Sequence, residues 1–162
     1  MSGPPRIHPQ HDRTRLGAAE LQQLVDAAPL HRELEMKVQP AGEGRVVIEA
    51  VAGAAHLNAE GSAVVHGGIV ATLLDAAATF VLIALDGDDW STVDLRIDYL
   101  RPVPAGPLRV AGEVVHAGRR VGRASAALSC VPSGQDCARA TGTFVRAPTR
   151  GPASQSQEVA DQ

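Results

Sequence analysis

The chain has few aromatic residues, and this shortage argues against one class of protein. Its 162 residues include four aromatic side chains, which are Phe80, Trp90, Tyr99 and Phe144. Proteins that bind single-stranded nucleic acid stack bases on several aromatic rings, and most nucleic-acid binders carry a strong positive charge. Because the net charge here is -3, we expect no nucleic-acid partner.

Cysteines are also scarce, with only Cys130 and Cys137 present. They fit no metal-binding pattern with a nearby pair of histidines, and two cysteines do not form a disulfide scaffold in a chain of this length. We interpret both as small apolar residues in a reducing cytosol, and we expect no metal and no cofactor. The N-terminal MSGPPRIHPQHDR lacks the apolar core of a signal peptide, which also predicts a cytoplasmic protein.

One apolar run, from Gly67 to Leu85, is long enough to cross a bilayer. Asp75 would lie near its centre, at a cost of about 2.5 to 3.5 kcal/mol for insertion. The run is rich in small residues, and aspartates rather than lysines or arginines follow it. The pattern therefore predicts a buried core helix and no membrane partner.

The hydrophobic periodicity predicts a single α+β domain over residues 14–147, between a disordered N-terminus at 1–13 and a disordered polar tail at 148–162. Helices and strands are segregated along the chain, which favours one curved, mainly antiparallel sheet wrapped around the long helix. The expected helices cover 14–28, ended by Pro29, and 67–85. The expected strands are a hairpin of 33–39 and 45–51, then 93–99, 108–116, 121–131 and 137–145 in meander spacing.

Asp75 interrupts the apolar stretch VHGGIVATLLDAAATF. An aspartate is costly to bury unless it is paired or protonated. At about 100° per residue, the residues on its side of the helix do not make a solvated charged face; they are Ala71, Ala78, Thr79 and Leu82. Asp75 is either part of an exposed stripe or a nucleophile or general base, and the pattern favours the second interpretation.

His66-Gly67-Gly68 stands where the loop enters the helix. The N-terminus of a helix carries unpaired N–H groups and the positive end of its dipole, and glycine lets a ligand approach the backbone closely. Such amides can polarise a carbonyl group and stabilise an oxyanion. The alternative is that the two glycines only form a permissive turn.

Distance along the helix limits how these groups can cooperate. Gly67 and Asp75 are about 12 Å apart at 1.5 Å per residue, whereas a nucleophile and an oxyanion donor must both lie within about 3 Å of the reacting atoms. One chain's own pair therefore cannot serve the same carbon. Two antiparallel copies of the helix around a two-fold axis could do so, which predicts a homodimer with two equivalent, shared sites.

His66-Gly67-Gly68, followed by Leu73 and Asp75, resembles the HGG-x(4)-L-x-D signature of hotdog-fold thioesterases. These are the PaaI-type acyl-CoA thioesterases and relatives of human thioesterase superfamily member 2, within the 4-hydroxybenzoyl-CoA thioesterase superfamily. The similarity continues downstream and covers about residues 30–146. It includes the segments 92–102, 116–119 and 142–144.

The resemblance implies a hotdog fold, homodimers that pair again into homotetramers, and hydrolysis of an acyl-CoA to free acid and CoA without a metal. In that scheme the Gly67 N–H polarises the thioester carbonyl, and the partner subunit's Asp75 attacks it or activates water. His66 lies near the sulfur. Thr92 matches a hydroxyl that helps to place water.

The remaining candidates are substrate-binding residues. Gly68 belongs to the same glycine pair, and Thr79 follows Asp75 by one helical turn, where it could also simply pack. Arg119 and Arg120 occupy a predicted turn. They are either solvated strand ends or a clamp for the CoA phosphates.

The chain departs from the family pattern before the histidine. Family members commonly have an asparagine six residues before it, where this chain has Glu60. Asn58-Ala59-Glu60-Gly61 resembles the family's N-x-x-G with two residues inserted afterwards, so we assign the assisting role at the carbonyl to Asn58.

Two other functions stay open. A hotdog enoyl-CoA hydratase or dehydratase would use His66 or Asp75 as acid or base, although such enzymes more often carry Asp-x(4)-His early in the helix, which is absent here. A non-enzymatic acyl-CoA-binding module would keep the fold alone. The presence of both Asp75 and the HGG segment favours the thioesterase.

Overall fold

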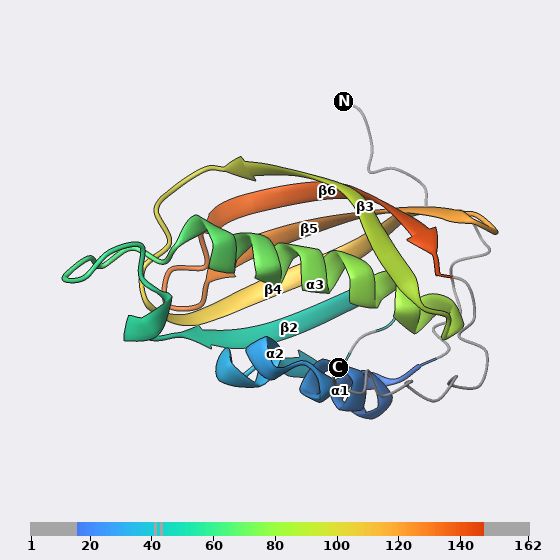
Figure 1. Ribbon diagram of the computed structural model, residues 1–162, viewed down its shortest axis with the longest axis horizontal. Helices are drawn as coiled ribbons and strands as arrows, with labels where there is room; N and C mark the ends of the chain where they lie inside the picture. Colours follow the sequence, from blue (N-terminus) through green and yellow to red (C-terminus); the bar gives the residue numbers. More distant parts are fainter. Residues whose placement is uncertain (1–15, 41, 43, 148–162) are drawn as a thin grey trace, which may run out of the picture.

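The computed structural model describes residues 16–40, 42 and 44–147 and shows a curved sheet with one long helix lying against it (Figure 1). All neighbouring strands are antiparallel, in the order β1-β2-β4-β5-β6-β3. This confirms the predicted α+β arrangement. The elements are α1 (Ala18–Ala27), α2 (Pro29–Glu33), β1 (Lys37–Gln39), β2 (Arg45–Ala52), a 3-10 turn η2 (Ala54–His56), α3 (Gly67–Asp86), β3 (Trp90–Tyr99), β4 (Gly106–Ala117), β5 (Val121–Cys130) and β6 (Asp136–Arg146).

Helix α3 is the centre of the molecule, and its sequence explains both of its ends. His66 is the N-cap, and Gly87 ends the helix in the left-handed conformation that glycine adopts without strain. By length and composition alone α3 could cross a membrane, but 61% of its most apolar window is buried inside the protein. It is therefore the core helix of a soluble fold, as predicted.

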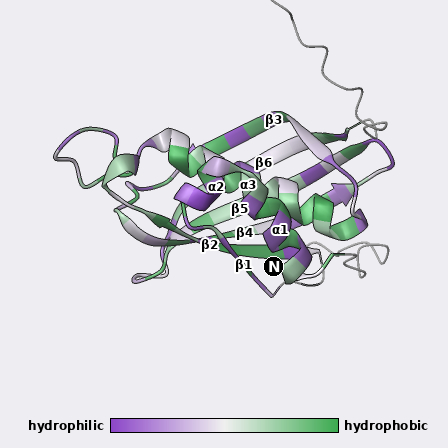
Figure 2. Ribbon diagram, turned by 60° about the horizontal axis from the view of Figure 1, so that its bottom comes forward, coloured by the Kyte–Doolittle hydropathy of each residue, from purple (hydrophilic) through white to green (hydrophobic). Residues whose placement is uncertain are grey.

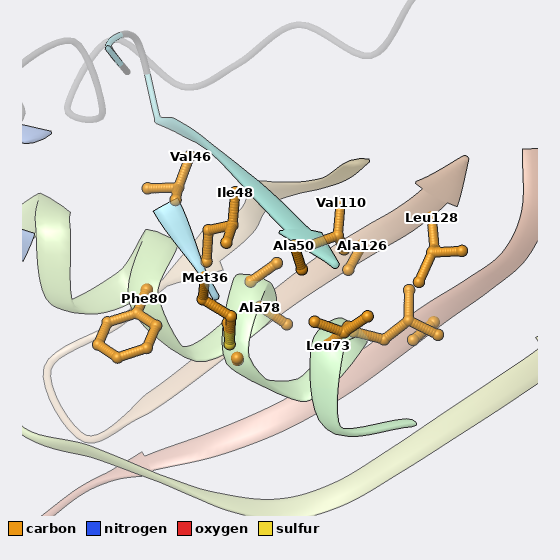
Figure 3. Packing of buried hydrophobic residues seen from close by; sticks show 14 of the residues in the cluster. Met36, Val46, Ile48, Ala50, Leu73, Ala78, Phe80, Val110, Ala126 and Leu128 are labelled. Atoms are coloured by element: carbon orange, nitrogen blue, oxygen red, sulfur yellow. The ribbon is translucent and has the colours of Figure 1, made fainter. Parts of the chain in front are cut away.

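The core fills the space between α3 and the concave face of the sheet. Figure 3 shows α3 side chains packed against residues from the strands, and among those it labels are Leu73, Ala78, Phe80, Ile48, Val110, Ala126 and Leu128. At Gly112 of β4 the sheet approaches the helix so closely that a Cβ atom would lie 2.6 Å from the carbonyl carbon of Ala77. Glycine is required there by close approach, not by its backbone angles.

The sheet order differs from the simple meander that the spacing predicted. Strands β4, β5 and β6 do follow one another, but β3 pairs with β6, and β2 takes the place beside β4. Helix α3 carries the chain from β2 across the sheet to its far edge, and this crossover separates β3 from β4. Strand β3 is therefore an edge strand, with alternating hydrophilic and hydrophobic bands along it (Figure 2).

The N-terminal prediction also needs a correction. Helix α1 ends at Ala27, but Pro29 begins the second helix α2, so the next strand starts at Lys37 rather than at residue 33. Proline is well suited to the first helical position, because its fixed φ angle fits the helix and the N–H it lacks has no intrahelical partner there. Leu34 and Met36 are nevertheless buried, as the alternating pattern implied.

The predicted hairpin of β1 and β2 is present. The predicted disordered segments 1–13 and 148–162, and the start of the first predicted helix, lie outside the described residues.

The two cysteines are buried next to each other, with 2.9 Å between the sulfur atoms of Cys130 and Cys137. Burial, together with the hydrogen bond to Cys137, raises the pKa of the Cys130 thiol to about 11. A protonated, buried thiol is a poor nucleophile. The pair therefore behaves as small apolar core residues, as its sequence context predicted.

Candidate active site

The N-terminus of α3 is held by its own histidine. The Gly68 N–H donates to Nδ1 of His66 at 2.9 Å, and the His66 N–H donates to the carbonyl of His56 at 2.8 Å. A Cβ atom at Gly68 would lie 3.0 Å from the same Nδ1, so the second glycine makes room for the cap. Because Nδ1 accepts a bond, the neutral ring carries its hydrogen on Nε2, which can act as a donor.

A hollow of about 560 Å³ lies at this end of the helix. Gly67 and Asn58 both line it, together with an arginine and a mainly apolar wall. The N–H groups in the first turn of a helix have no partner within the helix, and they carry the positive end of its dipole. The hollow can therefore accommodate an apolar ligand with a carbonyl group at its edge. The other lining residues are Val64, Val65, Val70, Tyr99, Leu100, Arg101, Pro102 and Val103.

Asn58 reaches this hollow although the sequence between it and His66 is longer than in the family pattern. Leu57 and Val65 pair as an antiparallel bridge, and the Asn58 N–H donates to the carbonyl of Val64 at 2.9 Å. The intervening loop turns at Gly61, whose φ is 73°. The loop absorbs the extra residues because its two ends are fixed to each other, and Asn58 thus shares the hollow with Gly67.

Asp75 lies elsewhere and has a specific partner. It is half-buried on α3, and its carboxylate accepts a hydrogen bond from the Thr92 hydroxyl at 2.8 Å. Thr92 lies on β3 at an irregularity in the pairing with β6, between Thr92 and Asp94. Such a bulge redirects a side chain. The structure thus brings together two residues that are distant in sequence and that were both predicted to belong to the site.

Within one chain these residues form two separate groups. Gly67 and Asn58 line the hollow, whereas Asp75 and Thr92 are not among its lining residues. The rise of α3 separates Gly67 from Asp75 by about 12 Å.

The predicted substrate-binding residues are more scattered. Thr79 is half-buried one turn after Asp75. Arg119 and Arg120 form the turn between β4 and β5, and their carbonyls accept hydrogen bonds from Arg146. Because Arg146 also pairs with Asp86 at the C-terminal end of α3, both arginines lie at the opposite end of the helix from Gly67 in the same chain.

Sequence reasoning missed Tyr99. Its hydroxyl donates to the carbonyl of Gly67 at 2.9 Å, and its side chain lines the hollow. The alternation along 93–99 had already placed Tyr99 on the same face of its strand as Leu95 and Ile97. That pattern could have directed it toward the helix, but nothing local indicates which end of α3 it contacts.

Within the described ranges, no group of three His, Cys, Asp or Glu side chains could hold a metal ion.

Comparison with known proteins identifies the family. The sequence profile of the thioesterase superfamily matches residues 63–136. An X-ray structure of a thioesterase-superfamily protein is 30% identical to the chain, covers 79% of it and 96% of its own length, and superposes with a TM-score of 0.75. The chain belongs to the thioesterase superfamily. The hotdog fold and the family resemblance predicted from the HGG segment are thereby confirmed.

Two further similarities are consistent with this assignment. The crystal structure of zebrafish thioesterase superfamily member 2 is 26% identical, covers 82% of this chain and 99% of its own, and has a TM-score of 0.73. A provisionally named esterase of Saccharolobus solfataricus is 32% identical over 84 residues, which are 51% of this chain and 55% of that protein. The alignment thus spans about half the length of this curated relative.

Proposed function

We propose that this protein hydrolyses an acyl-CoA thioester to free acid and CoA, in the cytoplasm and without a metal, at two equivalent sites shared across a homodimer. The observation that carries the proposal is the division of the site residues into two groups, one around Gly67 and one around Asp75 of the same helix. Gly67 and Asn58 border the hollow, and Asp75, which accepts a hydrogen bond from Thr92, lies about 12 Å from Gly67 along α3. Each group supplies half of what thioester hydrolysis requires.

The first half-site binds the carbonyl group. The thioester oxygen accepts a hydrogen bond from the Gly67 N–H, with the Asn58 side-chain amide as a second donor. Charge develops on this oxygen as the carbonyl carbon becomes tetrahedral, and donors fixed in advance stabilise that charge. The His66 cap already uses the Gly68 N–H, so Gly67 is the glycine whose N–H faces the substrate.

The second half-site supplies the attack. As general base, Asp75 takes a proton from water while the water oxygen bonds to the carbonyl carbon; the C–S bond then breaks, and the CoA sulfur leaves with the proton that Asp75 accepted. As nucleophile, Asp75 bonds to the carbonyl carbon and the C–S bond breaks, which leaves a mixed anhydride and a CoA thiolate; water then hydrolyses the anhydride and supplies the proton for the thiolate. The Thr92 hydroxyl orients the carboxylate, and Nε2–H of His66 stabilises the leaving sulfur.

A dimer would join the two half-sites. β3 is an edge strand, and edge strands present unpaired backbone groups to a partner. Large apolar side chains along this strand are exposed, including 62% of Val93 and 55% of Tyr99. Pairing two copies around a two-fold axis would set the helices antiparallel and bring the Gly67 of one protomer toward the partner's Asp75. We further propose that two such dimers form a homotetramer.

The same symmetry would bring the arginine turn nearer to the substrate. Along one α3, Gly67 and Asp86 are separated by about 28 Å. If the two-fold axis passes midway between Gly67 and Asp75, the partner's Gly67 lies level with Asp75. Measured along the helix axis, the C-terminal end of α3 is then only about 16 Å from the partner's Gly67. Arg119 and Arg120, beside that end, would then bind the phosphates of a CoA whose thioester lies in the shared site.

Complementation between subunits tests the shared site. An Asp75→Asn chain and a Gly67→Pro chain should each be inactive, and their heterodimer should recover activity at one of its two sites. Proline suits the first helical position and removes only the proposed N–H, and the preceding His66 has a ψ of 134°, which proline accepts. Heterodimers verified by native mass spectrometry that release no thiol would contradict a site built from two chains.

Removing the Thr92 hydroxyl should weaken catalysis without affecting folding. Thr92→Val keeps the shape of the side chain but deletes the bond to Asp75, so we expect kcat to fall about tenfold with little change in KM. Steady-state thiol release measures this effect. Ser91→Ala on the same strand is the matched control, and equal losses in both variants would indicate a general effect on β3.

A panel of acyl-CoAs with a thiol-trapping reagent separates the three candidate functions. Thiol release that disappears in Asp75→Asn supports hydrolysis. A change in enoyl absorbance without thiol release would indicate the hydratase or dehydratase. Saturable binding without turnover would indicate an acyl-CoA-binding module.

A further inference from the structure

Tyr99 makes two contacts at the N-terminus of α3. Its hydroxyl donates to the carbonyl oxygen of Gly67 at 2.9 Å. Its ring edge and hydroxyl lie 3.5 Å from the position that a Cβ atom would take at Gly67. The end of β3 is thereby fixed to the residue whose N–H is proposed to bind the thioester oxygen.

The first turn of α3 needs such a contact. It begins with two glycines, and glycine loses more conformational freedom on folding than any other residue. His66 holds the turn from within the segment, through the Gly68 N–H. Tyr99 holds it from a different element, through the peptide group between Gly67 and Gly68. Only a contact from outside the helix can fix its first turn relative to the sheet.

The ring of Tyr99 also forms part of the wall of the hollow. More than half of Tyr99 is exposed, at 55%, and it is the one aromatic residue among those that line the hollow. Because its hydroxyl is bonded to Gly67, the side chain contributes mainly apolar carbon surface to the wall. The rest of the wall is largely aliphatic, including Val70, Leu100 and Val103. A bulky ring there limits the room for a group bound with its carbonyl at Gly67.

We infer that Tyr99 is a positioning and specificity-determining residue: its hydroxyl fixes the Gly67 carbonyl, and with it the backbone of the residue whose N–H faces the thioester carbonyl, and its ring limits the size of the acyl group in the hollow. The inference rests on the proposed thioesterase function. Two variants test the two roles of Tyr99 separately. Tyr99→Phe deletes the hydroxyl alone, whereas Tyr99→Leu deletes the hydroxyl and also replaces the ring in the wall of the hollow with a smaller side chain.

Kinetics on the full-length protein with acetyl-CoA, hexanoyl-CoA and decanoyl-CoA test both parts. For Tyr99→Phe we expect kcat to fall about tenfold on the best substrate, with KM within about twofold and the order of acyl preference unchanged. For Tyr99→Leu we expect the same loss of kcat. We also expect the kcat/KM for decanoyl-CoA, divided by that for acetyl-CoA, to rise about tenfold relative to the wild type. Ser129→Ala, which deletes a hydroxyl-to-carbonyl bond between β5 and β4, is the control and should match the wild type.

Hydrogen exchange provides a readout that does not depend on activity. Peptides covering residues 66–72 should take up deuterium faster in Tyr99→Phe than in the wild type, whereas Ser129→Ala should not change their uptake. A Tyr99→Phe variant with wild-type kcat and wild-type exchange overturns the positioning role. A folded Tyr99→Leu variant with unchanged acyl preference overturns the specificity role.

The outcomes distinguish this inference from the proposed function. A wild-type protein that releases no thiol from any acyl-CoA would defeat the thioesterase proposal and, with it, the role of Tyr99 in catalysis. An active wild type with unaffected Tyr99 variants would leave the thioesterase intact and defeat only the inference.

Discussion

Asp75→Asn should abolish thiol release while leaving the protein folded. The amide is nearly isosteric with the carboxylate and can still accept a bond from Thr92, but it can neither take a proton from water nor attack a carbonyl carbon effectively. Because general-base catalysis typically contributes 10²- to 10⁴-fold, we expect kcat to fall by at least about 100-fold. Thiol release from the best acyl-CoA in the panel measures the loss.

The control for this variant is another aspartate on the same protomer. Asp98 lies on β3, is exposed, and pairs with Arg96 in a surface ion pair at 3.1 Å. Such pairs contribute little to stability, so Asp98→Asn should keep both the activity and the melting temperature of the wild type. A fully active Asp75→Asn protein would end the assignment of Asp75, and equal losses in both variants would point to a general effect of charge.

Gly112→Ala should produce the largest loss of stability among single changes of one methyl group. The added Cβ would lie 2.6 Å from the carbonyl carbon of Ala77 and closer still to its oxygen. Backbone cannot rotate away as a flexible side chain can, so α3 must move from β4 or the sheet must bend. Overpacking of this kind costs about 1 to 3 kcal/mol, and we expect the upper end, or about 10 °C in melting temperature.

Thermal and urea unfolding measure this change in the free energy of unfolding. Gly53→Ala is the matched control, because a Cβ there meets nothing within 4 Å and the backbone is extended, with φ at -96°. It should unfold like the wild type. A Gly112→Ala protein that is as stable as Gly53→Ala would show that the helix and the sheet are less tightly packed than the structure indicates. Since α3 carries both Gly67 and Asp75, and the added methyl group displaces α3, the variant should also lose activity at temperatures where it stays folded.

Local patterns predicted most of the secondary structure. The alternation of apolar residues located β4, β5 and β6 to within about two residues at each end, and the unbroken apolar run with its glycine start located α3. These features depend on near neighbours in the chain, so they can be predicted without a structure. Pro29 was the exception, because the same residue can follow one helix or begin another.

Local sequence patterns did not predict the order of the strands in the sheet or the contacts between the site residues. The spacing of the last four strands suggested a meander, yet β3 lies beside β6 because α3 crosses the sheet between β2 and β3. The bond from Thr92 to Asp75 and the bond from Tyr99 to Gly67 follow directly from that position of β3. The local sequence pattern does not indicate which distant segments pair with each other, so neither contact could be deduced from the spacing.

The sequence by itself determined the core helix, its glycine start, its isolated aspartate and the distance between them, because the rise of a helix is the same in every protein. It also determined the family, through the HGG segment and Asp75. Only the tertiary structure decided which residues accompany each half: Asn58 and Tyr99 at Gly67, Thr92 at Asp75. Those partners come from a loop and a strand whose positions depend on packing across the whole sheet.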